Sequence, residues 1–284
     1  MEFKAALCLQ GGAMRCVFTA GVLDAFIDNN IEFCDVYGIS AATKDMQYYP
    51  TKQRGYAYKG DVEAALDNNV FNLANVMLGK PVINDDYYIK EIRDKKFPLD
   101  NELLQASKCK LHVGCTNIET CEIEYFEKDD PQFLESMKAS CALPVLQPVV
   151  DIRGKKYLDG GCSEPVPYKS ALKDGFDKIV VVLTREKGFR EDENDSKFNL
   201  FYRMKYMNYP KFIELLDKQN KLFNESYDEL DQLEKEGKII VIRPSYKTDV
   251  DRLEKNIEKL QKLYQDGYNE GLKALNKFVN YFND

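Results

Sequence analysis

The stretch Val36-Tyr-Gly-Ile-Ser-Ala-Ala-Thr43 indicates the fold of this chain most directly. An apolar segment, Phe33 to Tyr37, reads as a strand, and a helix-compatible segment follows it. Gly38-Ile-Ser40-Ala-Ala42 is close to G-x-S-x-G, the nucleophile elbow that places a serine hydroxyl on a sharp strand-to-helix turn. Small residues are needed there because strand and helix nearly touch. Alone, the pattern is weak, and an ordinary strand-turn-helix is the simpler explanation.

The residues before this stretch predict another strand and helix. Ala5 to Leu9 reads as a short buried strand, Gln10 to Cys16 as a glycine-rich turn, and Phe18 to Ile27 carries apolar residues at helical spacing. The order strand, helix, strand, helix predicts a parallel sheet with right-handed crossovers. Because neighbouring parallel strands end at the same edge, we expect residues 11–15 and Ser40 to lie together.

The glycine-rich loop is open to three interpretations. It lacks both the G-x-G-x-x-G spacing and the Lys-Ser/Thr end of a P-loop, so a nucleotide site is the weakest of them. A plain tight turn is the simplest. The third is an oxyanion hole, in which the backbone N–H groups of the loop stabilise negative charge beside a nucleophile.

Further elements follow from periodicity along the rest of the chain. The predicted helices span residues 84–94, 99–107, 131–139 and 214–236, the predicted strands span 111–116, 122–126, 178–183 and 239–242, and a hairpin turn falls at 153–155. The charged segment 184–198 reads as a surface loop. One long helical stripe, which we expect to face the core, comprises Leu253, Ile257, Leu260, Tyr264, Tyr268, Leu272, Leu275 and Val279.

Composition narrows the class of protein. The chain has 284 residues, of which 44% are hydrophobic and 31% charged, as in folded globular domains. Its net charge of -7 argues against nucleic-acid binding and against electrostatic capture by anionic membranes, so any membrane contact would be apolar. With no signal peptide and no apolar run of about 18 residues, we expect a soluble cytoplasmic protein.

The cysteines and the histidine limit the chemistry. None of the eight cysteines forms C-x-x-C, which disfavours a metal site and favours reduced thiols in the core. The single histidine, His112, lies in a segment that alternates like a strand interior, where a structural role is the expected one. If Ser40 is a nucleophile, we therefore expect its base not to be a histidine.

A third motif lies downstream, where Asp159-Gly-Gly161 follows a predicted strand; taken alone it is a turn. Together and in this order, Gly11-Gly-Ala-Met-Arg15, Gly38-Ile-Ser-Ala-Ala42 and Asp159-Gly-Gly161 resemble the patatin-like phospholipases. That family carries a G-G-G-x-[KR]-G loop, a G-x-S-x-G elbow and a D-G-[GA] motif. The resemblance to its bacterial branch extends to residues 18–24, 140–144, 178–185, 251–254 and 264–268, and covers nearly the whole chain.

The resemblance implies an α/β protein: a three-layer α/β/α patatin-like fold with a mostly parallel central sheet and a helical C-terminal lobe. We expect the hydrolase domain over residues 1–200 and a mostly helical extension, packed on it, over 201–284. The implied activity is that of a serine acyl-ester hydrolase, a lipid acyl hydrolase of phospholipase A type, which needs no metal or cofactor. Its partners would be a lipid or other acyl ester and, transiently, a membrane surface, with no nucleic acid.

The resemblance also implies the site residues. Ser40 is the expected nucleophile and Asp159 the base of a Ser-Asp dyad that works through an acyl-enzyme. The expected oxyanion loop comprises Gly11, Gly12, Ala13, Met14 and Arg15, and the elbow residues are Gly38 and Ala42. Burial would raise the pKa of Asp159 and make it a better base.

Three departures from the family pattern leave a second function open. Ala13, Cys16 and Ala42 stand where the family has glycine. If Ala13 or Ala42 has a positive φ, each costs roughly 1–2 kcal/mol. The alternative is a catalytically impaired patatin-like protein that binds acyl chains or a partner.

Overall fold

The computed structural model describes residues 2–72, 74–75, 80–193 and 199–282. One eight-stranded sheet runs through it in the order β5-β6-β3-β2-β1-β7-β8, with β4 also paired to β3. The strands are β1 (Glu2–Leu9), β2 (Glu32–Ile39), β3 (Lys110–Asn117), β4 (Ile123–Glu127), β5 (Val150–Ile152), β6 (Lys155–Asp159), β7 (Ile179–Val182) and β8 (Ile239–Ile242).

The sheet is mostly parallel, as predicted. The pairs β1–β2, β2–β3, β1–β7 and β7–β8 are parallel, whereas β4, β5 and β6 pair in the antiparallel sense. The run Ile179–Val182 is buried at every position and lies between β1 and β8. That burial explains its unbroken apolar sequence, which is typical of a strand covered on both faces.

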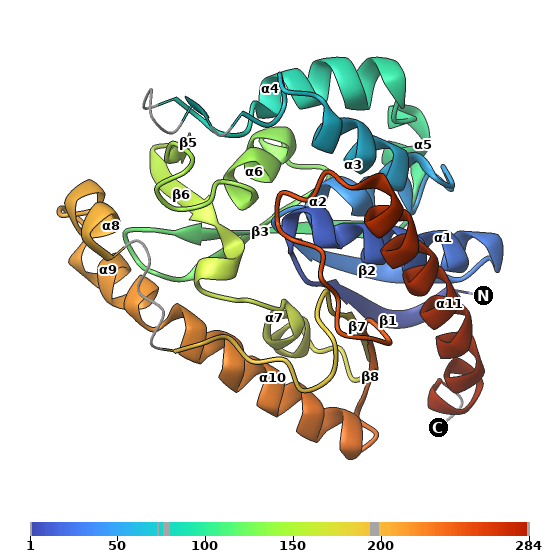
Figure 1. The fold of residues 1–284 in the computed structure, drawn as a ribbon. Helices are drawn as coiled ribbons and strands as arrows, with labels where there is room; N and C mark the ends of the chain where they lie inside the picture. The colour runs from blue at the N-terminus through green and yellow to red at the C-terminus, as the bar shows by residue number, and fades with distance from the viewer. Residues whose placement is uncertain (1, 73, 76–79, 194–198, 283–284) are drawn as a thin grey trace.

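Helices cover both faces of the sheet, giving the three expected layers. Along β1, Leu7 and Leu9 pack into the core shared with α1 (Val17–Asp28) and α11 (Ile257–Tyr281), whereas Cys8 packs with α7 (Tyr168–Lys173) and α10 (Gln219–Lys235). In Figure 1, α1, α3 and α11 lie on one side of the strands, and α7 and α10 on the other. This alternation is the period of two expected of a strand buried on both faces.

The remaining helices agree with most of the predicted segments. They are α2 (Ala42–Asp45), α3 (Tyr56–Leu66), α4 (Asp85–Tyr87), α5 (Asn101–Ala106), α6 (Phe133–Ser140), α8 (Asn199–Lys205) and α9 (Pro210–Asp217). Segment 84–94 is helical, but a π-helix, Tyr88–Lys96, follows α4. Lys218 divides α9 from α10 within the predicted helix 214–236. No helix or strand occupies 184–193, and the rest of the predicted loop, 194–198, lies outside the described residues.

The predicted core stripe of α11 is confirmed only in part, since Leu260 is buried and Tyr264 and Leu275 pack against the core. Ile257 and Val279, which were assigned to the core stripe, are 46% and 58% exposed. The buried face carries Leu260, Leu263, Gly267, Gly271, Ala274 and Phe278. The glycines allow backbone contact with α1, since a Cβ built on Gly267 would lie 2.0 Å from the carbonyl oxygen of Phe18. A stripe defined by apolar side chains leaves out glycine, so the predicted stripe lies beside the face that is actually buried.

Two strands meet end to end along one edge of β3, and this arrangement positions the site. β2 ends with Ile39 opposite Gly114, and β6 ends with Asp159 opposite Cys115. β4 occupies the opposite edge of β3, where it pairs with residues 112–116. β6 pairs with some of the same residues of β3, so it must lie on the edge that β2 occupies. β2 is parallel to β3 and β6 antiparallel, so their carboxyl ends point toward each other.

The helices were also compared with the length and hydropathy of a membrane span. No helix among the described residues is both long enough and apolar enough to cross a lipid bilayer.

Candidate active site

Ser40 occupies the strained turn that the elbow pattern predicts. Its φ is +56°, a left-handed conformation that is energetically unfavourable for any residue other than glycine. Gly38 permits the turn, because a Cβ there would lie 2.6 Å from the sulfur of Met46. After the turn, the Thr43 hydroxyl donates to the carbonyl oxygen of Ser40 at 2.7 Å. Ser40 is thereby held out at the end of β2, half-buried.

The structure brings Ser40 and Asp159 into direct contact. The Ser40 hydroxyl donates to Asp159 Oδ2 at 2.7 Å, and the Gly161 amide donates to Asp159 Oδ1 at 2.8 Å. Asp159 is 4% exposed. A Cβ on Gly160 would lie 2.3 Å from the carbonyl oxygen of Gly114, so only glycine fits directly after the aspartate. Two motifs separated by 119 residues thus form one hydrogen-bonded pair.

Burial sets the proton affinity of this carboxyl. Desolvation raises the pKa of Asp159 from 3.8 to about 6, against the lowering effect of hydrogen bonds from Ser40 and Gly161 and of the Arg252 charge. Arg252 comes from the segment that precedes α11. A carboxylate with this pKa is largely ionised at neutral pH and is a stronger base than an exposed aspartate.

Ser140 holds the elbow in place, a role that the sequence did not reveal. Its hydroxyl accepts a hydrogen bond from the Ser40 amide at 2.8 Å and donates one to the carbonyl oxygen of Gly114 at 2.7 Å. Ser140 is fully buried at the end of α6. The resemblance included residues 140–144, but no residue pattern signals a hydroxyl that links two strand ends.

The glycine-rich loop lies against the nucleophile. A Cβ on Gly11 would lie 2.6 Å from the Cβ of Ser40. The Met14 amide donates to the carbonyl oxygen of Arg252 and the Arg15 amide to that of Gly12, both at 3.2 Å. Within the described part of the chain, the Gly11, Gly12 and Ala13 amides donate to no group. Of the five residues expected to form the oxyanion loop, these three therefore have amides that a ligand could use, and Gly12 and Ala13 are the two that the resemblance assigns to the oxyanion.

The three departures from glycine have different structural consequences. Ala13 has a φ of +51°, so its side chain is strained. Ala42 starts α2 and is not among the residues with positive φ, so no glycine is required there. Cys16 is fully buried, and its thiol lies 3.8 Å from the carbonyl oxygen of Gln10.

The remaining candidates lie apart from the dyad. His112 Nε2 is 2.7 Å from Asp35 Oδ1, and its ring stacks on Tyr37 with centroids 4.2 Å apart, which is the structural role expected of it. The Arg15 side chain is 6% exposed. Burial, and then the charges of Arg185 and Arg252, lowers its pKa to about 10.

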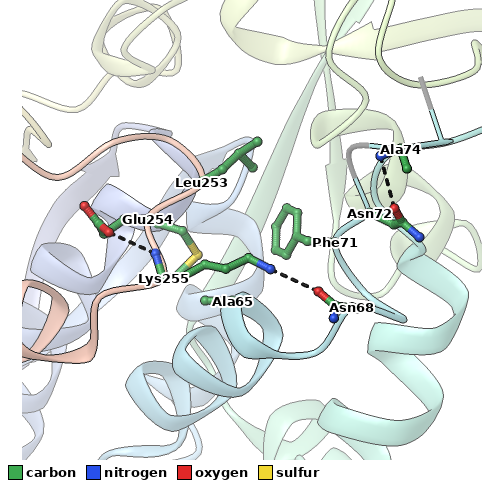
Figure 2. Close-up of a pocket in the computed structure, with 9 residues that line it drawn as sticks. Ala65, Asn68, Phe71, Asn72, Ala74, Leu253, Glu254 and Lys255 are labelled. Carbon is green, nitrogen blue, oxygen red and sulfur yellow. Dashed lines mark hydrogen bonds between the residues drawn. The ribbon is translucent and has the colours of Figure 1, made fainter. Parts of the chain in front are cut away.

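A small cavity lies beside Ser40, next to a wider cleft. The cavity has a volume of about 50 Å³, and Ala13, Ala41 and Leu143 line it next to Ser40. Met14 and Phe71 line both this cavity and a cleft of about 230 Å³. Figure 2 shows the cleft, across which the Lys255 ammonium donates to Asn68 Oδ1. The segment before α11 thus forms a wall of the approach to Ser40.

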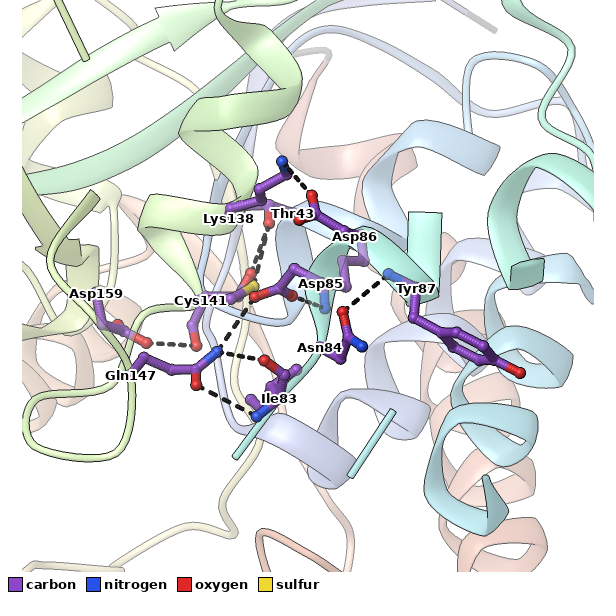
Figure 3. A network of polar contacts seen from close by, with 12 residues as sticks. Thr43, Ile83, Asn84, Asp85, Asp86, Tyr87, Lys138, Cys141, Gln147 and Asp159 are labelled. Carbon is purple, nitrogen blue, oxygen red and sulfur yellow. Dashed lines mark hydrogen bonds and ion pairs between the residues drawn. The ribbon is translucent and has the colours of Figure 1, made fainter. Parts of the chain in front are cut away.

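A second polar network extends from the elbow. Lys44 Nζ donates to Asp85 Oδ1 at 2.8 Å, and Gln147 Nε2 donates to Asp85 Oδ2 at 3.3 Å. Figure 3 shows Asp85 and Gln147 next to the contact between the Thr43 hydroxyl and the Cys141 thiol. Lys44 follows Ser40 by one helical turn and lines the small cavity. No residue pattern signals this contact of Lys44, because a lysine on a short helix is usually solvated.

Comparisons with known proteins agree with the predicted resemblance. Residues 52–172 match the family of patatin-like phospholipases, and residues 209–283 match a domain of unknown function. Asp159 lies within the patatin match and Ser40 before it. The chain is 29% identical over 187 residues to the uncharacterized protein YjjU of Escherichia coli strain K12, covering 64% of this chain and 52% of that protein. It therefore matches about half the length of this relative.

A solved structure was also matched. VipD from Legionella pneumophila aligns with a TM-score of 0.46 and 14% identity, covering 98% of this chain and 67% of VipD.

Proposed function

The chain carries a patatin-like phospholipase domain, and we propose that it is a serine acyl-ester hydrolase that uses Ser40 and Asp159 as a dyad. The observation that carries the proposal is the 2.7 Å hydrogen bond from the Ser40 hydroxyl to a buried carboxylate, on an elbow held at positive φ. A nucleophile, its base and free amides then lie within one small site.

The mechanism follows from these contacts. Ser40 Oγ attacks the ester carbonyl carbon while its proton passes to Asp159 Oδ2. The Gly12 and Ala13 amides stabilise the negative oxygen of the tetrahedral intermediate. Asp159 then gives the proton to the departing alcohol, which leaves an acyl group on Ser40. In the second step, Asp159 takes a proton from water, the water attacks the acyl carbon, and the proton returns to Ser40 as the acid leaves.

The proposed substrates are acyl esters of lipids, as in the family that matches residues 52–172. We propose a phospholipase A-like role in lipid degradation and a transient, apolar contact with the membrane that holds the substrate. The cytoplasm is the compartment we propose, because the eight cysteines are free thiols and five of them are buried.

The test is hydrolysis of p-nitrophenyl butyrate by the purified protein. Ser40→Ala and Asp159→Asn should each lower kcat/KM by at least about a thousandfold, because nucleophile and base act as a unit. Ser245→Ala serves as the matched control, since Ser245 is exposed and outside the site, and it should retain wild-type activity. Equal activity in wild type and Ser40→Ala would refute the proposal.

The impaired scaffold is the second candidate, and the strained Ala13 favours it. A displaced oxyanion donor can reduce a rate on the order of a hundredfold. If the wild type is impaired, restoring glycine at positions 13, 16 and 42 should increase its activity sharply, with Ala13→Gly responsible for most of the gain. No gain in an inactive wild type would count against this candidate as well.

A further inference from the structure

The cavity beside Ser40 has an apolar body and a polar end. Its apolar lining comprises Ala13, Met14, Ala41, Ala64, Val70, Phe71, Ile83 and Leu143, and Lys44, Asp61, Tyr88 and Cys141 complete it next to Ser40. A pocket for an unsubstituted alkyl chain needs no charged or hydroxyl groups, because the chain cannot hydrogen-bond to them. The polar residues in the lining therefore indicate that the acyl group bound here is not a plain alkyl chain.

Lys44 forms an ion pair with Asp85, and the two charges cancel. Its Nζ lies 2.8 Å from Asp85 Oδ1 and 4.2 Å from the centroid of the Tyr88 ring. Asp85 also accepts from Gln147 (Figure 3). The charge of Lys44 is therefore balanced within the wall of the cavity.

Asp61, unlike Asp85, has no ion-pair or hydrogen-bond partner within bonding distance among the described residues. It lies on α3, is 8% exposed, and its Oδ2 is buried without a hydrogen bond in the part of the chain that the structure describes. The Tyr88 hydroxyl makes no hydrogen bond to a described residue either, and it lies 3.6 Å from a Cβ built on Gly60, the neighbour of Asp61. Buried polar groups in proteins are nearly always paired, so a buried carboxylate oxygen left unpaired in the lining of a nucleophile's cavity points to a ligand, and the Tyr88 hydroxyl lines the same cavity.

Size and charge restrict that ligand. A volume of about 50 Å³ admits only a few groups the size of water. Burial raises the pKa of Asp61 to about 7 and that of its neighbour Asp45 well above its usual range. The Asp61 carboxyl is therefore readily protonated near neutral pH, which favours an uncharged hydrogen-bonding group over a cation.

We propose that this cavity is the acyl pocket and that Asp61, with the Tyr88 hydroxyl, selects short acyl groups that carry a hydroxyl. This inference rests on the proposed esterase function and narrows its substrate. A hydroxyl on the acyl chain would pair with both groups, whereas a plain alkyl chain would bury them unpaired. A longer acyl chain would not fit, because the volume of the cavity is only about 50 Å³.

The test compares p-nitrophenyl esters of butyrate, 3-hydroxybutyrate and octanoate. Wild type should hydrolyse the 3-hydroxybutyrate ester with a kcat/KM at least about tenfold above that for butyrate, and octanoate should be poorest. Asp61→Leu should abolish the preference for the hydroxylated ester, measured as the ratio of the two kcat/KM values within this one variant. Asp129→Leu, which removes an exposed carboxylate outside the cavity, should keep the wild-type preference.

The outcomes separate this inference from the proposed function. Ser40-dependent hydrolysis with no preference for the hydroxylated ester, or with a preference that Asp61→Leu leaves intact, would overturn the inference and leave the esterase function standing. If no ester is hydrolysed, the esterase proposal fails.

Thermal shifts with the free acids then test the pocket directly. 3-Hydroxybutyrate should raise the Tm of wild type and not that of Asp61→Leu. An equal or larger shift with butyrate or 4-aminobutyrate would overturn the assignment to a hydroxylated acyl group.

Discussion

Asp159 links burial to catalysis at the scale of single residues. A dyad base works only when ionised, and desolvation raises the pKa of this carboxyl to about 6. The expected result is a kcat/KM for p-nitrophenyl butyrate that rises with pH, reaches half its maximum near pH 6 and is flat above about pH 7. Steady-state rates between pH 4.5 and 8 check this. A midpoint near pH 4, the value of an exposed aspartate, would contradict the burial argument.

Substituting glycine for Ala13 and for Ala42 compares a strained backbone position with an unstrained one. Ala13 has a φ of +51°, whereas Ala42 begins a helix. Ala13→Gly should stabilise the protein by about 1 kcal/mol, because glycine adopts positive φ without steric cost. Ala42→Gly should destabilise it by about 1 kcal/mol or more, because it adds a glycine to a helix and removes a buried methyl group. Urea unfolding measures both, and equal effects of the same sign would disprove the strain at Ala13.

The sequence identified some of the site and not the rest, for physical reasons. Ser40, Asp159 and the loop before Ala13 lie in motifs whose chemistry requires small residues next to a functional group, so they can be recognised along the chain. Ser140 acts through hydrogen bonds that form only in the folded chain. A serine at a helical position has many uses, and nothing in its sequence neighbours distinguishes Ser140 from others.

At the scale of elements, α1 and α11 pack with their backbones in contact. A Cβ on Gly267 would lie 2.0 Å from the carbonyl oxygen of Phe18, so Gly267→Ala must push the helices apart. We expect a loss of about 2 kcal/mol or more. Gly60→Ala is the control, since Gly60 is also helical but its nearest neighbour would be 3.6 Å away. It should be neutral or stabilise by up to about 1 kcal/mol. Equal losses in thermal unfolding would rule out the close packing.

Element types were easier to predict than their relations. Apolar runs such as Ile179–Val182 and Ile239–Ile242 located strands closely, because continuous burial leaves a continuous pattern. The predicted stripe of α11 matches its buried face only in part, because Gly267 and Gly271, which contact α1, carry no hydrophobic signal. The end-to-end meeting of β2 and β6 on β3 depends on strand register, which only the folded sheet determines.

At the scale of the whole molecule, we propose that the extension after residue 200 is packed on the hydrolase domain as an obligatory part of it. β8 pairs with β7 in the common sheet, and Leu260, Leu263 and Phe278 lie in the main core. A chain ending at residue 200 should therefore show no cooperative thermal unfolding, because it would expose that core. A cooperative transition with wild-type circular dichroism would instead show that residues 1–200 fold alone.

Whether the assembled site is competent is tested most directly by labelling with a fluorophosphonate, a probe that reacts with activated serines. Intact mass spectrometry of wild type should show one adduct, and peptide mapping should place it on Ser40. The adduct should be absent in Ser40→Ala, much slower to form in Asp159→Asn, and unchanged in Ser245→Ala. A folded wild type that takes up no probe, or an adduct that persists in Ser40→Ala, would contradict the dyad.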